Sequence, residues 1–162
     1  MLPALLLPAA LAAPSEPVQA KAPAAAASFD PIVFELVKGN GIDFVTNSSR
    51  TTHRHQPETM VAGIALFDYD NDGKLDVFLT NGAKMTELDK KEPVFWNRLY
   101  HNLGDWKFED VTEKAGLKGH GYDNGVATGD FDNDGFTDLF VAGLKENVLY
   151  RNKGDGTFED VT

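Results

Sequence analysis

The stretch IALFDYDNDGKLDVFLT, residues 64–80, recurs 62 residues later as VATGDFDNDGFTDLFVA, residues 126–142, with 8 of 17 positions identical. A second pair, LYHNLGDWKFEDVT at 99–112 and LYRNKGDGTFEDVT at 149–162, is offset by 50 residues, with 10 of 14 positions identical. Two copies of one structural unit are therefore expected. Because the two offsets differ by 12 residues, the first copy carries an insertion at about residues 85–96, for which we expect a loop.

Each copy contains four short runs that are rich in β-branched and aromatic residues and bounded by Gly, Asn and Asp. In the first copy these runs are residues 61–67, 77–80, 98–101 and 108–111. The pattern predicts four strands in an antiparallel meander. The inner runs, IALF and VFL, are continuously apolar, as expected when neighbouring sheets cover both faces.

A radial array of small four-stranded sheets meets this condition. The expected fold is therefore all-β, with two four-stranded antiparallel blades of a β-propeller. Two blades are too few to close a ring of roughly four to eight, so we expect an incomplete propeller. The two copies are assigned to residues 61–115 and 122–162.

The strongest chemical signal is a nine-residue loop, D-x-D-x-D-G-x-x-D, which occurs once in each copy. Carboxylates at positions 1, 3, 5 and 9, with Gly at position 6, form an oxygen cage of the kind that binds calcium, which takes about six to eight oxygen ligands. We expect the backbone carbonyl of position 7 to contribute as well. The predicted ligands are Asp68, Asp70, Asp72, Lys74 and Asp76 in the first loop, and Asp130, Asp132, Asp134, Phe136 and Asp138 in the second.

A simple acidic turn, an EF-hand and a site for a different metal all fit these loops less well. Asp-Gly is a common hairpin turn, but two copies with the same four carboxylates favour a metal site over a turn without one. An EF-hand requires Glu at position 12, where this chain has Leu79 and Val141. Magnesium prefers a tighter octahedral shell, and the absence of Cys and His from both loops disfavours zinc and copper.

The carboxylates of one loop repel each other in the absence of a cation. Two carboxylates about 5 Å apart repel by roughly 3 kcal/mol at an effective dielectric constant near 20. We therefore expect calcium to be structural, with ion binding coupled to the formation of the hairpin.

Composition excludes several classes of partner. The formal net charge is -10, which disfavours binding to nucleic acid and to anionic membrane surfaces. The chain has no cysteine, so an exported domain of this kind must be stabilised by size, repetition or metal rather than by disulfides.

The N-terminal part of the sequence differs from the rest. Residues 1–20 are interpreted as a signal peptide with an apolar region too short to span a bilayer, which needs about 20 apolar residues. Residues 21–40 are expected to form a disordered Pro/Ala-rich linker and lead-in. In residues 41–60, the stretch GIDFVT is similar to the last strand of a copy and is predicted to be a strand followed by a connection. The mature chain is thus expected to be secreted, periplasmic or at the cell surface, without a membrane span.

The aspartate loops, the preceding VATGDFD and the pattern LYRNKGDGTFEDVT together resemble the FG-GAP (VCBS) repeats of integrin-α-type propellers. The resemblance covers about residues 41–162 and is greatest to the bacterial proteins related to cartilage acidic protein and UnbV. It implies a propeller of about seven blades with calcium bound in the hairpin loops of successive blades, of which this chain would be an N-terminal fragment.

No motif of a known catalytic site occurs, and carboxylates that neutralise a structural cation are not free to transfer protons. We therefore expect a non-catalytic scaffold whose loops, such as residues 85–96, bind an unidentified protein or glycan. The alternative is an accessory propeller of an exported enzyme, such as a lyase, phospholipase or other hydrolase, whose catalytic domain lies beyond residue 162. A third hypothesis is that the two repeats alone assemble as a small oligomer.

Two weaker signals concern single residues. His101 aligns with Arg151 of the other copy and is expected at the surface. Trp96 and Trp106 are candidate contacts for a sugar or peptide, although large aromatic residues in a small β-repeat more often lie in the core.

Overall fold

The computed structural model describes residues 32–60 and 62–162. The segments interpreted as a signal peptide and as most of the Pro/Ala linker lie in residues 1–31, outside the described part. All helices and strands of the described residues belong to one compact unit, Leu36–Thr162. Within the described residues, no helix has both the length and the apolar composition needed to cross a membrane.

The first repeat forms a four-stranded antiparallel sheet. Its strands are β1 (Ile64–Phe67), β2 (Asp76–Leu79), β3 (Arg98–Gly104) and β4 (Lys107–Asp110), and they are hydrogen-bonded in the order β1-β2-β3-β4. In this register Ala65 lies opposite Phe78, which in turn lies opposite Leu99. The sheet is the predicted meander, although β3 extends beyond its expected end at His101.

The second repeat forms a sheet with the same topology. Its strands are β5 (Asp123–Gly129), β6 (Asp138–Gly143), β7 (Asn147–Asn152) and β8 (Phe158–Asp160), in the order β5-β6-β7-β8. Ala127, Phe140 and Leu149 occupy the positions equivalent to Ala65, Phe78 and Leu99. The prediction of an all-β fold with two four-stranded antiparallel sheets is confirmed.

Three short helical turns connect these elements: η1 (Gln56–Thr59), η2 (Pro93–Phe95) and α1 (Thr112–Ala115). The last of them carries the chain from the first sheet to the second. It ends at Gly116, whose φ of 79° is left-handed and suits glycine. The hydroxyl of Thr112 accepts a hydrogen bond of 2.9 Å from the backbone N–H of Leu99, which ties α1 to β3.

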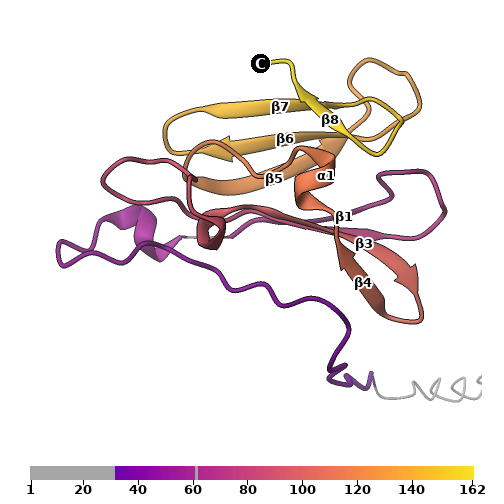
Figure 1. The fold of residues 1–162 in the computed structure, drawn as a ribbon, viewed down its shortest axis with the longest axis horizontal. Helices are drawn as coiled ribbons and strands as arrows, with labels where there is room; N and C mark the ends of the chain where they lie inside the picture. The colour runs from indigo at the N-terminus through magenta and orange to yellow at the C-terminus, as the bar shows by residue number, and fades with distance from the viewer. Residues whose placement is uncertain (1–31, 61) are drawn as a thin grey trace, which may run out of the picture. The chain divides into compact units, whose positions relative to one another are not determined.

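The two sheets are stacked on each other in Figure 1. Side chains of both sheets form one apolar core. The first sheet contributes Ala65, Phe67, Phe78 and Leu99, and the second contributes Leu139, Val141, Val148, Tyr150 and Phe158. Loops and connections contribute further core residues: Tyr69, Val111, Ala115 and Leu117. Apolar burial between the repeats is therefore the main contribution to the stability of the fold.

The opposite faces of both sheets are open in part. Ile64 and Leu66 on β1 are 63% and 58% exposed, and Phe140 on β6 is 43% exposed. The expectation that both faces of the inner strands would be covered is therefore wrong for these strands. The reason is that each sheet has only one neighbouring sheet within the described residues.

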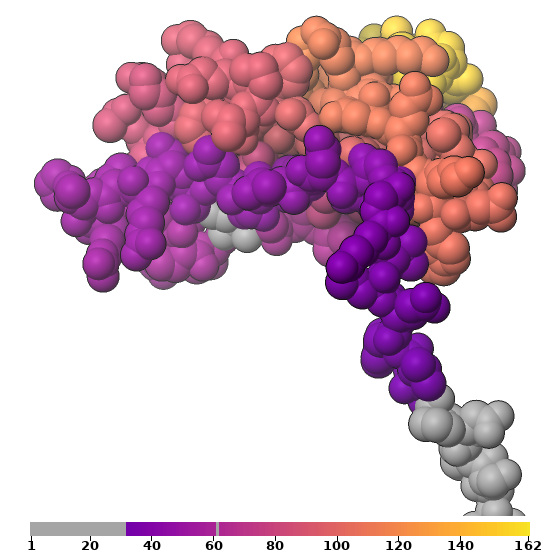
Figure 2. All heavy atoms as spheres, turned by 60° about the horizontal axis from the view of Figure 1, so that its bottom comes forward, coloured from indigo at the N-terminus to yellow at the C-terminus, as the bar shows by residue number. Residues whose placement is uncertain are grey.

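Residues 41–46, expected to be a strand, run along the first sheet without joining a ladder, and no strand is assigned between residues 41 and 60. The Tyr100 hydroxyl donates a hydrogen bond of 3.1 Å to Asp43, and the backbone N–H of Asn47 donates one of 2.7 Å to the side-chain oxygen of Asn81. Figure 2 shows this purple stretch lying along the surface of the unit. The stretch meets the edge strand β4 through one backbone hydrogen bond, from the Phe108 N–H to the Asn40 carbonyl at 2.7 Å, and this single bond does not make a ladder.

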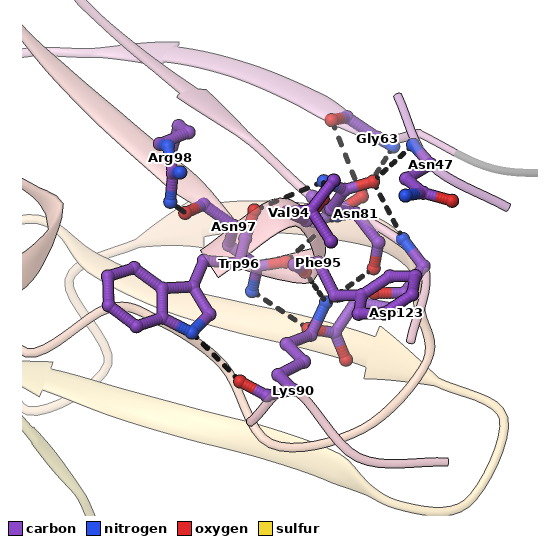
Figure 3. A network of polar contacts seen from close by, with 12 residues as sticks. Asn47, Gly63, Asn81, Lys90, Val94, Phe95, Trp96, Asn97, Arg98 and Asp123 are labelled. Carbon is purple, nitrogen blue, oxygen red and sulfur yellow. Dashed lines mark hydrogen bonds and ion pairs between the residues drawn. The ribbon is translucent and has the colours of Figure 1, made fainter. Parts of the chain in front are cut away.

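The insertion of the first repeat is not a simple loop, because it contains η2 and a buried cation, Lys90 (Figure 3). The Lys90 ammonium donates hydrogen bonds to the carbonyl oxygens of Asn81 at 2.5 Å, Gly82 at 2.7 Å and Phe95 at 2.9 Å. It also lies 3.5 Å from a carboxylate oxygen of Asp123 at the start of β5. The insertion is thus fastened both to its own repeat and to the second one.

Candidate metal centre

The two aspartate loops join equivalent strands and adopt the same backbone course. The first connects β1 to β2, and the second connects β5 to β6. Position 4 has a φ near 60° in both, at Asn71 and Asn133, and position 6 has a φ of 84° at Gly73 and 91° at Gly135. Asn and Gly are the residues that tolerate this left-handed region best, so the D-N-D-G segment turns the chain back on itself.

The first aspartate of each loop accepts backbone hydrogen bonds within the loop. The two side-chain oxygens of Asp68 accept from the N–H groups of Asp72 at 3.0 Å and Gly73 at 2.8 Å. Asp130 repeats this arrangement with distances of 3.1 and 2.9 Å. These bonds direct the carboxylate toward the inside of the turn.

The last aspartate of each loop lies at the start of the second strand and is buried. The oxygens of Asp76 accept from the backbone N–H groups of Tyr69 at 3.0 Å and Asn102 at 2.8 Å. Asp138 accepts from Phe131 at 3.0 Å and Asn152 at 2.7 Å. Burial raises the pKa of the Asp76 carboxyl, although the two amide donors act in the opposite direction.

Three predicted ligands of each loop converge on one point. Asp68, Asp70 and Asp76 each place a carboxylate oxygen within 4.8 Å of the others, and Asp130, Asp132 and Asp138 do the same. Moreover, Oδ1 of Asp70 is buried and has no hydrogen-bond partner within the described residues. Buried acceptors are rarely left without a donor, and a cation coordinated by the three carboxylates would satisfy this one. The residues of the first loop therefore fit a hard cation.

The aspartate at position 5 is not part of these trios, although Asp72 forms a separate group with Asp70 and His101 whose ligand atoms lie within 4.8 Å of one another. One oxygen of Asp72 accepts a hydrogen bond of 2.9 Å from the N–H of Lys74, and the other pairs with the ammonium of the same lysine. The hydrogen bond from the Lys74 side chain lowers the pKa of Asp72. Asp134 likewise accepts from the N–H of Phe136 at 2.9 Å. The predicted roles of the Lys74 and Phe136 carbonyls stay predictions, because the contacts described at these residues involve their N–H groups.

The two loops differ in the side chain that faces them from β3 or β7. In the first, Nδ1 of His101 lies 3.2 Å from Asp76 and 3.5 Å from Asp70. In the second, the Arg151 guanidinium lies 2.7 Å from Asp132 and 3.4 Å from Asp134. The expectation that His101 is a plain surface position is therefore wrong.

Sequence reasoning missed both roles, although the 50-residue offset had already paired these two residues. The sequence signal for this role was a nitrogen-containing side chain at the same position of both repeats. His101 lies three residues before Gly104, and Arg151 lies three residues before Gly154. Its meaning becomes visible only when β3 and β7 are paired beside the loops.

The two tryptophans also differ from each other. Trp106 is 71% exposed at the β3–β4 turn, so the expectation of a core position is wrong for it. Trp96 is half-buried: its indole N–H donates a hydrogen bond of 2.8 Å to the Lys90 carbonyl, and the Lys118 ammonium lies 4.2 Å from the ring centroid. Trp96 thus helps to hold the insertion in place (Figure 3).

Comparison with known proteins agrees with this geometry. Residues 68–141 and 130–162 match the model of the FG-GAP-like repeat family. A search among curated proteins finds no match. The family match begins at the first aspartate of the first loop and includes both loops. This chain is therefore a member of the FG-GAP-like repeat family, with two repeats between residues 68 and 162.

Proposed function

We propose that this protein is a calcium-binding, non-catalytic repeat scaffold that acts outside the cytoplasm. The observation that carries the proposal is the convergence of the Asp68, Asp70 and Asp76 carboxylates, where one buried oxygen of Asp70 lacks a donor. The carboxylates of Asp130, Asp132 and Asp138 converge in the same way in the second loop. An all-oxygen donor set with flexible geometry favours calcium over magnesium and over transition metals.

A structural role for the ion follows from where the loops lie. Each loop joins the first two strands of its sheet, and its carboxylates repel each other unless a cation neutralises them. When bound, calcium supplies this neutralising charge. The residues of the chain do the rest: Asp68 shapes the turn, and Asp76 links the loop to β3 through the Asn102 N–H.

Titration with calcium tests the metal proposal. We expect two ions to bind per chain in calorimetry, and calcium to raise the melting temperature relative to chelator-treated protein, since a ligand at 100 times its Kd stabilises by about 2.7 kcal/mol. Asp70→Asn and Asp132→Asn should each remove one site. Glu87→Gln, in the insertion, is the matched control and should retain both. A melting temperature that is the same in calcium and in chelator would overturn the structural role.

We expect a partner to bind at loops that are held rigidly beside the sheets. The insertion of the first repeat is the best candidate for such a binding loop. Its anchor Lys90 is buried, while Val94 is 51% exposed and Glu92 is also exposed. A fixed backbone with exposed side chains lowers the entropic cost of binding. The proposed partner is a protein or a glycan. Binding to a glycan array or to candidate cell-surface proteins should decrease in a Glu92→Ala/Val94→Ala variant, and unchanged binding would exclude the insertion.

The finer classification is part of the same proposal. The patterns VATGDFD and LYRNKGDGTFEDVT support a place among the bacterial relatives of cartilage acidic protein and UnbV. Sequencing the gene beyond the codon for Thr162 tests this directly. Further repeats of the same type would support the scaffold, whereas a catalytic domain would favour an accessory role in an exported enzyme.

A further inference from the structure

The two aspartate loops contain the same carboxylates, but a different nitrogen group faces each of them. Neither loop contains a histidine, and β3 places His101 beside the first loop, where β7 places Arg151 beside the second. A neutral imidazole has one nitrogen that can bind a metal ion, whereas a guanidinium in a protein stays protonated and offers no free electron pair. The first loop therefore adds a nitrogen donor to its oxygen donors, and the second does not.

Nδ1 of His101 lies at the spacing of ligands that share one small metal ion. It is 3.2 Å from Oδ1 of Asp76 and 3.5 Å from Oδ2 of Asp70. Two ligands that are each about 2.1 Å from one tetrahedral ion lie roughly 3.4 Å apart. The Asp72 carboxylate is also near His101, but it is paired with the Lys74 ammonium. Asp70 and Asp76 are therefore the carboxylates best placed to share an ion with the imidazole.

The imidazole is held in this position by the core. The His101 side chain is 19% exposed, and its ring meets the ring of the buried Tyr69 edge-on, with the centroids 5.6 Å apart. A hydrogen bond between His101 and Asp76 would account for the position of the ring. It would not account for Oδ1 of Asp70, which is buried and has no hydrogen-bond partner among the described residues. A cation bound by all three side chains accounts for both observations.

The second loop has a fixed positive charge where the first has the imidazole. The Arg151 guanidinium lies 2.7 Å from Asp132 and 3.4 Å from Asp134. An ion at Asp130, Asp132 and Asp138 must therefore bind through oxygen atoms alone, since Arg151 cannot act as a ligand. Calcium suits such a donor set, because it takes about six to eight oxygens in flexible geometry, whereas zinc takes about four ligands that usually include nitrogen or sulfur.

We propose that the first loop prefers zinc when zinc and calcium are both present, with Asp70, Asp76 and His101 as ligands, and that the second loop prefers calcium. This inference rests on the proposed function, because it presupposes that both loops bind divalent cations. Imidazole nitrogen suits zinc and carboxylate oxygen suits calcium, so a single side chain separates the two sites. The three ligands leave a fourth position for Asp68 or for water. In calcium alone, both loops bind calcium.

Equilibrium dialysis of the full chain against zinc and calcium together, followed by metal analysis, tests this preference. The wild type should retain one zinc and one calcium per chain. His101→Arg gives the first loop the side chain of the second, so this variant should retain calcium in both loops. Its zinc affinity should fall by at least the roughly 10–100-fold that loss of an outer-shell partner costs. Arg151→His is the reciprocal change and should exchange the second calcium for zinc.

The control is His120→Arg, which removes a histidine that lies 3.6 Å from Asp160 and outside both loops. It should retain zinc and calcium like the wild type. Calcium retained by His101→Arg shows that this variant is folded, so a loss of zinc alone assigns the effect to the imidazole. Zinc uptake that is the same in His101→Arg and in the wild type would refute the inference. A wild type that takes up calcium in both loops and no zinc would refute it as well, while leaving the proposed function intact. Only a chain that binds neither ion would contradict both.

Discussion

The side-chain amide of Asn71, in the first aspartate loop, donates a hydrogen bond of 3.1 Å to the backbone carbonyl of Gly135 in the second. The two residues lie 64 positions apart in sequence, yet the loops that carry them are in direct contact. An ion that orders the first loop therefore also orders Asn71, which is hydrogen-bonded to the second loop. Calcium at one loop should for this reason affect binding at the other.

Calcium binding to the two loops is predicted to be positively coupled through Asn71. A single hydrogen bond contributes about 1 kcal/mol, so Asn71→Gly should reduce the coupling between sites by up to roughly fivefold while retaining both sites. Glycine suits the positive φ at this position. Asn133→Gly is the matched control, because it removes the equivalent amide at the same φ. Calorimetric titration in dilute solution measures the coupling, and equal behaviour of the two variants would contradict the prediction.

The buried carboxylate of Asp76 is predicted to stabilise the fold even without metal. Both of its oxygens accept backbone hydrogen bonds, so Asp76→Asn directs an amide donor toward an N–H and should cost about 2–4 kcal/mol in the free energy of unfolding. Asp72→Asn, in the exposed part of the same loop, should cost far less. Urea unfolding in the presence of chelator makes the measurement. A loss that appears only in calcium would assign Asp76 to metal binding alone.

Removal of the Lys90 charge is predicted to destabilise the protein strongly. Lys90→Met removes the ammonium donor from three buried carbonyls, of which only that of Asn81 keeps another donor, the Asp123 N–H, and it leaves Asp123 without its cation; the expected cost is about 3–5 kcal/mol. Burial lowers the pKa of Lys90 to about 8, while the ion pair with Asp123 opposes this shift.

Two further variants serve as controls for Lys90. Lys91→Met removes an exposed cation that pairs with Asp89 and should change the stability by less than about 0.5 kcal/mol. Lys90→Met/Asp123→Asn should recover part of the loss, because no unpaired buried charge remains. Thermal melts compare these three variants with Asp123→Asn alone. A double variant less stable than the sum of its single losses would show that the ion pair is not the cause.

The buried tyrosines are predicted to ionise at a higher pH in the folded protein than in the unfolded chain. Burial raises the pKa of Tyr69, Tyr100 and Tyr122 to about 12, and it raises that of Tyr150 as well. Their ordinary pKa is about 10, so the unfolded chain releases these protons first. The stability that they contribute is thus complete below about pH 10 and is lost as the pH rises toward about 12. Absorbance of tyrosinate should increase near pH ~10 in denaturant and only well above it in the folded protein; matching titration curves would contradict the prediction.

The sequence by itself determined the features that depend on local pattern. The offsets of 62 and 50 residues, the alternation of short apolar runs with Gly and Asp, and the spacing of the carboxylates were sufficient to predict two four-stranded meanders and to place Asp68, Asp70 and Asp76 in one loop. These features depend on residues that are close together in the sequence, because a hairpin turn directly joins the two strands that it connects.

Only the tertiary structure decided the features that depend on contacts between distant residues. It placed His101 beside Asp76, buried Lys90 against Asp123, and left one oxygen of Asp70 without a donor. It also decided which face of each strand is covered, since a continuously apolar run has the same sequence pattern whether one neighbour or two pack against it. The physical reason is that hydrogen bonding and burial depend on which segments meet in space, and residues such as Asn71 and Gly135 meet only after both sheets have formed and packed together.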